Sequence, residues 1–309
     1  MTTLLYFDEV FLEHDTGLGH PERSDRLRSI IEALETPRFA SLTRRQPRDA
    51  TVAEIERVHR PAYVETILAS VPEFGSVAVD ADTVLSPGSG IAAIRAAGAL
   101  LSAVDAIMAG QADRAFCAVR PPGHHAEPAR GMGFCIFNNV AIGAAHALAA
   151  HGLERVAIVD FDVHHGNGTQ AAFYDKPAVL FGCSHQMPLY PGTGAPSETG
   201  SAGTILNVPL SPGDGGAEFR TAMQGAVLPR IAAFEPDLLL ISAGFDAHMR
   251  DPLAQLNLVE DDFAWATRAL MDVADATCDG RVVSVLEGGY DLTGLSRSVA
   301  VHVKTLMTA

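Results

Sequence analysis

Three polar residues at alternate positions follow a short apolar run in the middle of the chain. Residues 156–169 read VAIVDFDVHHGNGT, so Asp160, Asp162 and His164 come directly after the run VAIV. Because successive side chains alternate between the two sides of a strand, these side chains share one side of the strand end. Two carboxylates and an imidazole that converge there can hold a divalent metal ion. A polar loop is the alternative, but buried carboxylates are too costly to collect without a counter-ion.

Other predicted strands also end in polar residues. In an open parallel sheet, ligands bind beyond the carboxyl ends of the strands, so we expect these distant segments to meet in one crevice. Strand 115–119 is followed by His124 and His125, strand 238–242 by Asp246, and strand 282–286 by Glu287 and Tyr290.

Within that crevice we predict that Asp162, His164 and Asp246 are metal ligands. Such a set leaves positions open for water and substrate, as a catalytic metal requires. Zinc is the ion this set favours, although nitrogen and oxygen ligands would also accept iron. Asp160 is predicted to orient a histidine rather than to bind the ion.

His124 and His125 follow the rigid sequence Pro-Pro-Gly. One imidazole can accept the proton of water at the metal while the other hydrogen-bonds the same water. Tyr290 lies on a Gly-Gly turn, and its hydroxyl can donate to a developing oxyanion. Two surface histidines would be the alternative, and the presence of Tyr290 argues against it.

The elements that position these residues alternate regularly between strands and helices. This alternation implies right-handed crossovers, and therefore an α/β fold with an open, mostly parallel sheet flanked by helices on both faces. No linker or repeat divides the chain, so we predict a single domain over residues 1–309. The predicted strands are 4–7, 115–119, 156–160, 178–182, 205–208, 238–242 and 282–286. The predicted helices are 24–34, 62–69, 90–108, 139–150, 169–174, 217–234, 260–276 and 294–307.

The composition is that of a compact globular protein. Of the 309 residues, 48% are hydrophobic and 19% charged, which argues against extensive disorder. The formal charge of -15 repels nucleic acid and anionic membranes and mildly favours cationic substrates such as lysine side chains or polyamines. We therefore expect neither nucleic acid nor membrane as a partner. A homo-oligomer is compatible with the sequence.

The cysteines and the termini bear on location. Cys117, Cys135, Cys183 and Cys278 are widely spaced and form no C-x-x-C pair, which is typical of reduced thiols in the cytoplasm. We recognise no signal peptide and no apolar run of membrane-spanning length. These features predict a soluble, cytoplasmic protein.

Several long motifs, in the same order, resemble those of the histone deacetylase superfamily, which has the arginase-deacetylase fold. They are HPERSDRLRSI from His20, RPPGHHAEPARGMGFCIFNN from Arg120, VDFDVHHGNGTQ from Val159, SAGFDAHMRDPLAQ from Ser242 and LEGGYDL from Leu286. The likeness is closest to class II members and their bacterial homologues, the histone deacetylase-like amidohydrolases. It implies zinc-dependent hydrolysis of the amide of an acylated amine.

The resemblance also implies roles for single residues. Asp162, His164 and Asp246 match the zinc ligands, His124 and His125 the tandem histidines, Tyr290 the transition-state tyrosine, and Asp160 the carboxylate paired with His124. Asn167 stands where class I members carry aspartate, as in class II, and a neutral partner would hold His125 without raising its pKa.

Further positions match the substrate tunnel of the family. Phe134 and Tyr190 match its aromatic walls, with a tyrosine in place of the commoner phenylalanine, and Gly133 matches its floor. Arg23 matches a basic residue below the metal. The resemblance implies a structural potassium ion on Asp160, with Cys183 where a serine usually contributes.

The substrate is decided at the mouth of the tunnel. Leu253 follows Asp251 and Pro252, where polyamine-specific relatives carry a glutamate. An apolar gate gives no ion pair to a secondary ammonium, so an acyl-lysine peptide or protein is the predicted substrate. An acetylpolyamine or other small acylated amine is the alternative. A non-catalytic acyl-lysine binding module would lack the tyrosine or a ligand, and arginase-like hydrolysis would need two manganese ions and more aspartates.

Overall fold

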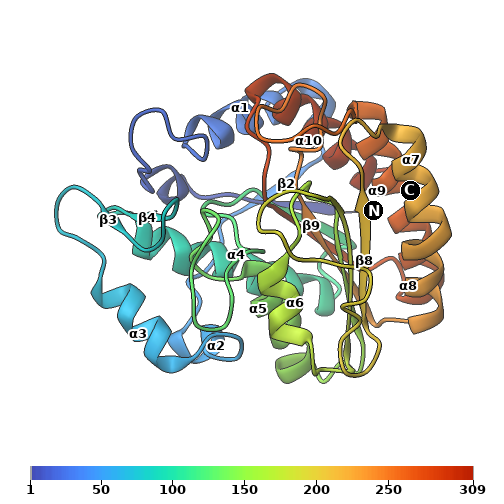
Figure 1. Ribbon diagram of the computed structural model, residues 1–309, viewed down its shortest axis with the longest axis horizontal. Coiled ribbons are helices and arrows are strands. Elements are labelled where there is room, and N and C mark those ends of the chain that lie inside the picture. Colours follow the sequence, from blue (N-terminus) through green and yellow to red (C-terminus); the bar gives the residue numbers. More distant parts are fainter. Residues whose placement is uncertain (1, 309) are drawn as a thin grey trace.

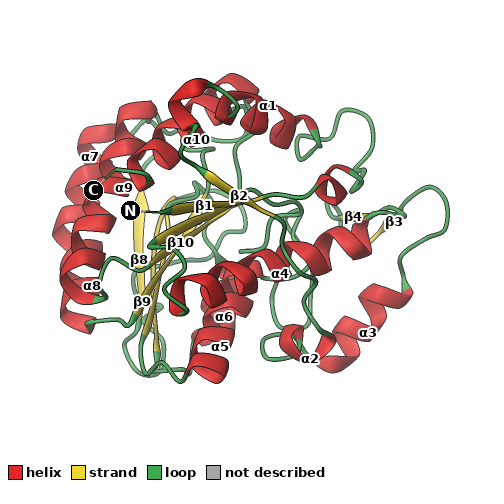
Figure 2. Cartoon of the chain, turned by 180° about the vertical axis from the view of Figure 1, so that it is seen from behind, coloured by secondary structure: helices red, strands yellow, loops and turns green. Residues whose placement is uncertain are grey.

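The computed structural model describes residues 2–308 and contains an open sheet in which every strand pair is parallel, with helices packed on both faces (Figures 1 and 2). The predicted fold class is therefore confirmed. The sheet has eight strands in the order β2-β1-β5-β10-β9-β6-β7-β8. These strands are β1 Thr3–Tyr6, β2 Thr43–Arg45, β5 Arg114–Cys117, β6 Val156–Asp160, β7 Val179–Gln186, β8 Ile205–Leu210, β9 Leu238–Ala243 and β10 Val282–Leu286.

The helices cover the sheet and bury its faces in one main hydrophobic core, which extends from Leu4 to Leu306. The longer helices are α1 Asp25–Leu34, α3 Pro61–Ala69, α4 Ser89–Met108, α5 Asn139–His151, α6 Asn167–Phe173, α7 Gly216–Ala222, α8 Leu228–Phe234, α9 Glu260–Thr277 and α10 Leu292–Leu306. A short α2 spans Val52–Ile55, and a π-helical turn at Met223–Val227 joins α7 to α8.

Four strands in the middle of the sheet carry the predicted site residues at their carboxyl ends. They are neighbours in the order β5-β10-β9-β6, although they are far apart in the sequence. Each is fully buried, because apolar residues face the helices on both sides. The loops after these strands therefore leave the same edge of the sheet side by side.

Several elements differ from the prediction. Strand β2, helix α2 and the hairpin of β3 (Val77–Ala78) with β4 (Val84–Leu85) were not predicted. β2 reads TRR and is largely exposed, so it lacks the apolar alternation that marks a strand. β7 continues to Gln186 beyond the predicted end at residue 182, and the polar residues of this extension are buried.

Helix α4 corrects the prediction that no apolar segment reaches membrane-spanning length. Within its 20 residues, an apolar window of 18 residues has a mean hydropathy of 1.7, so by length and composition alone the helix could cross a membrane. Within the fold, however, 67% of that apolar window is buried. A core helix that packs on a sheet shows the same pattern.

Candidate active site

The predicted metal ligands Asp162, His164 and Asp246 converge at the carboxyl ends of β6 and β9. All three are buried, and one potential ligand atom from each lies within 4.8 Å of the others. His164 Nδ1 is 3.0 Å from Asp162 Oδ1 and 3.2 Å from Asp246 Oδ2. These donors fit a divalent metal ion, since two carboxylates and one imidazole leave coordination positions open.

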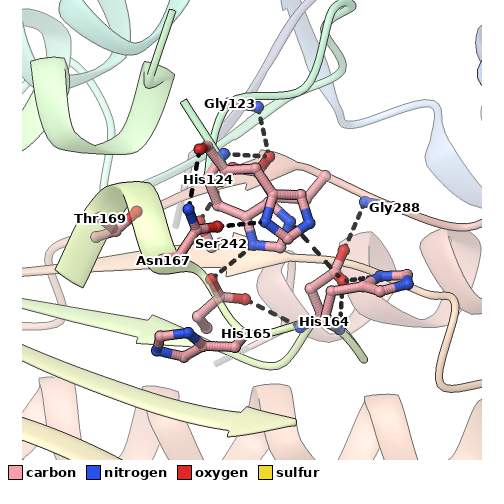
Figure 3. Close-up of polar contacts among 12 residues, drawn as sticks. Gly123, His124, His164, His165, Asn167, Thr169, Ser242 and Gly288 are labelled. Carbon is pink, nitrogen blue, oxygen red and sulfur yellow. Dashed lines mark hydrogen bonds and ion pairs between the residues drawn. The ribbon is translucent and has the colours of Figure 1, made fainter. Parts of the chain in front are cut away.

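The backbone holds the two carboxylates in place. Gly288 N–H donates to Asp162 Oδ2 at 2.8 Å (Figure 3). Val163 N–H donates to Asp246 Oδ1 at 2.9 Å. A Cβ atom at Gly244 would collide with the carboxylate of Asp162, so the chain needs glycine at that close approach. The pocket for the ion is thus shaped by main chain as well as by side chains.

The charges at this cluster call for a cation. Burial favours a neutral imidazole, but the carboxylates of Asp162 and Asp246 outweigh burial and raise the pKa of His164 to about 10. Burial, together with the charge of Asp162, raises the pKa of Asp246. No lysine or arginine among residues 2–308 forms an ion pair with either carboxylate. In the metal-free protein, a proton on His164 supplies positive charge to the two carboxylates. A bound metal ion would replace that proton as the source of positive charge.

His124 is paired with the predicted orienting carboxylate. Its Nδ1 lies 2.9 Å from Asp160 Oδ2, and its Nε2 lies 3.9 Å from Asp162 Oδ1. Burial would lower the pKa of His124, but the carboxylates of Asp160 and Asp162 raise it well above 6.5. The structure thus places Asp160 behind His124.

His125 is held by the neutral side chain of Asn167, which is held in turn by the carboxylate of Glu127. Asn167 Oδ1 lies 2.7 Å from His125 Nδ1, and Asn167 Nδ2 donates to Glu127 Oε1 at 2.8 Å. Because a carboxylate can only accept, the amide group of Asn167 must turn its NH₂ toward Glu127 and its oxygen toward His125. The proton of neutral His125 is therefore on Nδ1, and Nε2 carries the free lone pair.

Glu127 and Glu287 are site residues to which sequence reasoning gave no role. The buried carboxylate of Glu287 accepts from the N–H groups of Gly123 and His124 at 2.7 and 3.1 Å, and from Ser242 Oγ at 3.0 Å. It thereby ties the histidine loop, which carries His124 and His125, to the ends of β9 and β10. Glu287 comes directly after the buried strand β10, and an acidic residue at that position was the signal that could have indicated its role.

A narrow cavity of about 250 Å³ leads to the cluster. Its walls include every predicted tunnel residue except Arg23, together with the imidazoles of His125 and His164 and the ring of Tyr290. Asp82 and Leu189 also line it and were not predicted. The full lining is Asp82, His125, Gly133, Phe134, His164, Leu189, Tyr190, Leu253 and Tyr290.

Gly133 and Phe134 both adopt left-handed backbone conformations, with φ of 56° and 68°. A Cβ atom at Gly133 would collide with the ring of His125, so only glycine lets the wall approach that close. The ring of Phe134 packs edge-on against Tyr290, with centroids 5.8 Å apart. Tyr190 packs edge-on against His125 in the same way, at 5.2 Å.

Arg23 is a correction. Its side chain is 45% exposed and pairs with Asp25, so it does not lie below the metal cluster. The buried arginine of this segment is Arg26, whose Nε donates to the Gly289 carbonyl at 2.6 Å and whose guanidinium lies 4.8 Å from the centre of the Tyr290 ring. The helix begins at Asp25, so its buried face does not extend back to Arg23.

Asp251 connects the rim of the cavity to the tyrosine. Its carboxylate accepts from the N–H of Leu253 at 3.0 Å and from the N–H of Tyr290 at 2.7 Å.

Burial raises the pKa of the Tyr290 hydroxyl well above 10, against the opposing charge of Arg26. The phenol therefore keeps its proton at neutral pH and can donate a hydrogen bond.

The potassium ion that the resemblance implies stays a prediction. Cys183 on β7 is paired with Asp160 on β6. A potassium ligand at position 183 would therefore lie beside the carboxylate of Asp160. Burial raises the pKa of the Cys183 thiol well above 9, so its sulfur is neutral.

Comparison with known proteins decides the family. The histone deacetylase domain matches residues 20–306 of the chain. The chain belongs to the histone deacetylase family. Among other members, histone deacetylase 14, chloroplastic, of Arabidopsis thaliana is 40% identical, with 98% of this chain and 76% of the relative covered. The histone deacetylase-like amidohydrolase of Pseudomonas aeruginosa is 39% identical, with 93% and 81% covered.

The fold of this histone deacetylase family member also matches a solved structure. The crystal structure of the HDA15 HD domain superimposes with a TM-score of 0.94 at 38% sequence identity, covering 99% of this chain and 89% of that chain. The predicted family is therefore confirmed, and the chain is a hydrolase of the deacetylase kind.

Proposed function

We propose that this protein is a zinc-dependent deacylase that hydrolyses the amide of N-acetyl-lysine or a related acyl-lysine. One observation carries the proposal: the cluster of Asp162, His164 and Asp246 is reached through a cavity that His125 and Tyr290 also line. A metal-binding group, a proton acceptor and an oxyanion donor therefore face the same small volume, as hydrolysis of an amide requires.

Asp162, His164 and Asp246 would hold the ion, and the bound metal would polarise the amide carbonyl and acidify water. Mixed nitrogen and oxygen donors favour zinc and also accept iron. Metal analysis of the purified protein, followed by activity measurements after reconstitution with each ion, tests the choice. Higher turnover with iron than with zinc would contradict it.

His125 is the general base of the proposed reaction. It lines the cavity, and its proton is on Nδ1, so the lone pair of Nε2 is free to accept the proton of water. Burial and the nearby His124 and His164 lower the pKa of His125 well below 6.5. The neutral ring that a base requires is therefore the stable form.

His124 supplies positive charge behind the base. It is not part of the cavity wall, and its Nδ1 contacts the carboxylate of Asp160. A protonated His124 stabilises negative charge that develops on the substrate. Tyr290 donates from the other side of the cavity, and its ring is held between Phe134 and Arg26.

The mouth of the cavity favours acyl-lysine. Phe134, Leu189 and Leu253 line the cavity with apolar side chains, which suits the methylene chain of lysine, and Asp82 is the one acidic residue in the same lining. Leu253 offers no charge to the second ammonium of a polyamine. The measurement is kcat/KM for an acetyl-lysine peptide and for acetylputrescine with the same zinc-loaded enzyme. We expect the peptide to be the better substrate, and faster turnover of acetylputrescine would establish the alternative.

A non-catalytic acyl-lysine binding module would bind acyl-lysine without hydrolysing it. Zinc-loaded protein that binds acyl-lysine peptides but hydrolyses none of a panel of acyl groups would support such a module. The intact set of His125, Tyr290 and the metal cluster argues for catalysis.

We also propose that the protein acts in the cytoplasm, without nucleic acid or membrane as a partner. The four cysteines are buried and free, which suits a reducing compartment. The acidic net charge of -15 opposes binding to nucleic acid. Fractionation of the source cells tests the location.

A further inference from the structure

We propose that Asp105, His146 and His151 form a second metal site, away from the active site, which binds zinc or another borderline divalent cation such as nickel or copper. The three side chains offer ligand atoms within 4.8 Å of one another. None of them lines the catalytic cavity or contacts its residues. The proposal does not depend on the deacylase function.

The three ligand atoms lie close enough together to bind one ion after a small outward movement. The Nε2 atoms of His146 and His151 approach the same oxygen, Asp105 Oδ1, at 2.6 and 2.7 Å. Ligands about 2.0–2.1 Å from a tetrahedral ion lie about 3.3 Å apart, so each contact must widen by about 0.6 Å. Small rotations of side chains provide that movement, and the half-buried His151 and Asp105 leave room for water as a fourth ligand.

The fold brings the three ligands to the ends of two packed helices. Asp105 lies in the last turn of α4, and His151 is the last residue of α5. The two helices, labelled in Figure 2, pack together. A Cβ atom at Gly143 would lie 3.3 Å from Leu100 Cβ. Because helix carboxyl ends carry partial negative charge, both helix dipoles favour a cation at this position.

Two neighbouring residues flank the ligands and are paired with each other, since Arg48 Nη2 donates to Glu54 Oε1 at 2.7 Å. Arg48 lies 3.6 Å from Asp105 Oδ2, so the other carboxylate oxygen, Oδ1, is the one that faces the histidines. Glu54 Oε1 lies 3.8 Å from His146 Nδ1. When Nε2 binds an ion, the proton of a neutral imidazole moves to Nδ1, and Glu54 can then accept it, as carboxylates commonly do behind metal-bound histidines.

Arg57 opposes metal binding. Its Nη1 donates to His146 Nδ1 at 2.8 Å, which places the imidazole proton on Nε2, the atom that would bind the ion. Metal binding must therefore displace the guanidinium. Arg57 is exposed, so it can turn into solvent. The site should consequently bind metal more tightly when Arg57 is replaced by a neutral residue.

The test counts metal ions in the whole protein. Protein stripped with a chelator is titrated with Zn²⁺ and with Co²⁺, and binding is followed by equilibrium dialysis and by the visible spectrum of Co²⁺. We expect about two ions per wild-type chain and about one ion in Asp246→Asn, which disables the catalytic cluster. His151→Ala and Asp105→Asn should weaken the remaining site at least about tenfold.

Two further variants sharpen the result. Arg57→Gln should tighten the second site about twofold to fivefold, because one opposing charge is gone. Glu65→Gln removes an exposed carboxylate on α3 outside the cluster and should change nothing. The proposal is wrong if Asp246→Asn binds no ion at micromolar Zn²⁺, or if its remaining ion is retained with equal affinity after His151→Ala. Thermal unfolding with and without Zn²⁺ checks that each variant is folded.

Discussion

Glu127 Oε1 accepts a hydrogen bond of 2.8 Å from Asn167 Nδ2, and so fixes the direction in which the amide oxygen of Asn167 faces His125. A glutamine at position 127 can donate as well as accept, so Asn167 can then flip and lose the correct orientation. We expect Glu127→Gln to lower kcat about twofold to tenfold with little change in KM, since one hydrogen bond is worth about 1 kcal/mol.

Arg130 provides the matched control for this change. It lies 3.4 Å from the same carboxylate but does not touch Asn167. Arg130→Gln should leave kcat close to the wild-type value. Equal losses in the two variants would show that the ion pair between Glu127 and Arg130, not the orientation of Asn167, determines the rate.

Replacement of Tyr290 by phenylalanine tests the oxyanion donor. The hydroxyl of Tyr290 is the only part removed, so Tyr290→Phe should retain metal and the packing with Phe134. Loss of one oxyanion donor typically costs about 10²–10³ in kcat. Steady-state kinetics together with metal content measure both expectations. A variant with wild-type turnover would rule out the role.

Asp246→Asn tests the metal cluster. The substitution removes one of two buried carboxylates while Val163 N–H can still donate to the remaining oxygen. We expect the catalytic cluster of Asp246→Asn to be empty at micromolar Zn²⁺, and activity to be lost with the ion. Excess Zn²⁺ should restore part of the activity. Full activity at wild-type metal concentrations would mean that Asp246 is not a ligand.

Substitution of the buried Arg26 should destabilise the fold far more than substitution of the exposed Arg23. Arg26 and its partner Glu22 are both fully buried, so Arg26→Met leaves a buried carboxylate with one partner fewer. Breaking such a pair costs about 3–5 kcal/mol, and Arg120, which also pairs with Glu22, should keep the loss at the lower end. Arg23→Met, at an exposed position, should change the free energy of unfolding by less than about 0.5 kcal/mol. Urea denaturation of both variants measures the difference.

His302 predicts a loss of stability in acid. Thr267 Oγ1 donates to the Phe263 carbonyl, so it must accept from His302 Nδ1, and Ser284 Oγ donates to Nε2. Burial of this neutral ring lowers its pKa from 6.5 to about 3. Because the folded pKa lies below the unfolded one, the contribution is complete above pH 6.5 and is lost as the pH falls toward 3.

The slope of this loss can be measured. Between those pH values one such histidine costs about 1.4 kcal/mol per pH unit. We expect His302→Gln to be less stable than the wild type at pH 7.5 but to lose less stability on acidification to pH 5. Guanidinium unfolding at the two pH values gives the comparison. Parallel pH dependence in both proteins would show that His302 is not the titrating group.

The strand ends explain how much of the site could be predicted from the sequence. The buried runs before Asp162 and Asp246 predicted parallel strands, and parallel strands bring their carboxyl ends to one edge whatever their order. The metal cluster, the histidine loop and Tyr290 could therefore be predicted together. The short strand β2 and hairpin β3-β4 could not, because polar, exposed strands carry no hydrophobic period.

The sequence by itself determined the family, the fold class and which residue types face the ion, since these follow from motif order and from alternation along a strand. Only the tertiary structure decided that Arg23 is exposed while Arg26 packs against Tyr290, and that Glu127 and Glu287 support the histidines. It alone brought Asp105 to His146 and His151. The physical reason is that such contacts depend on how separate elements pack and where each helix begins, and neither is contained in a local pattern of residues.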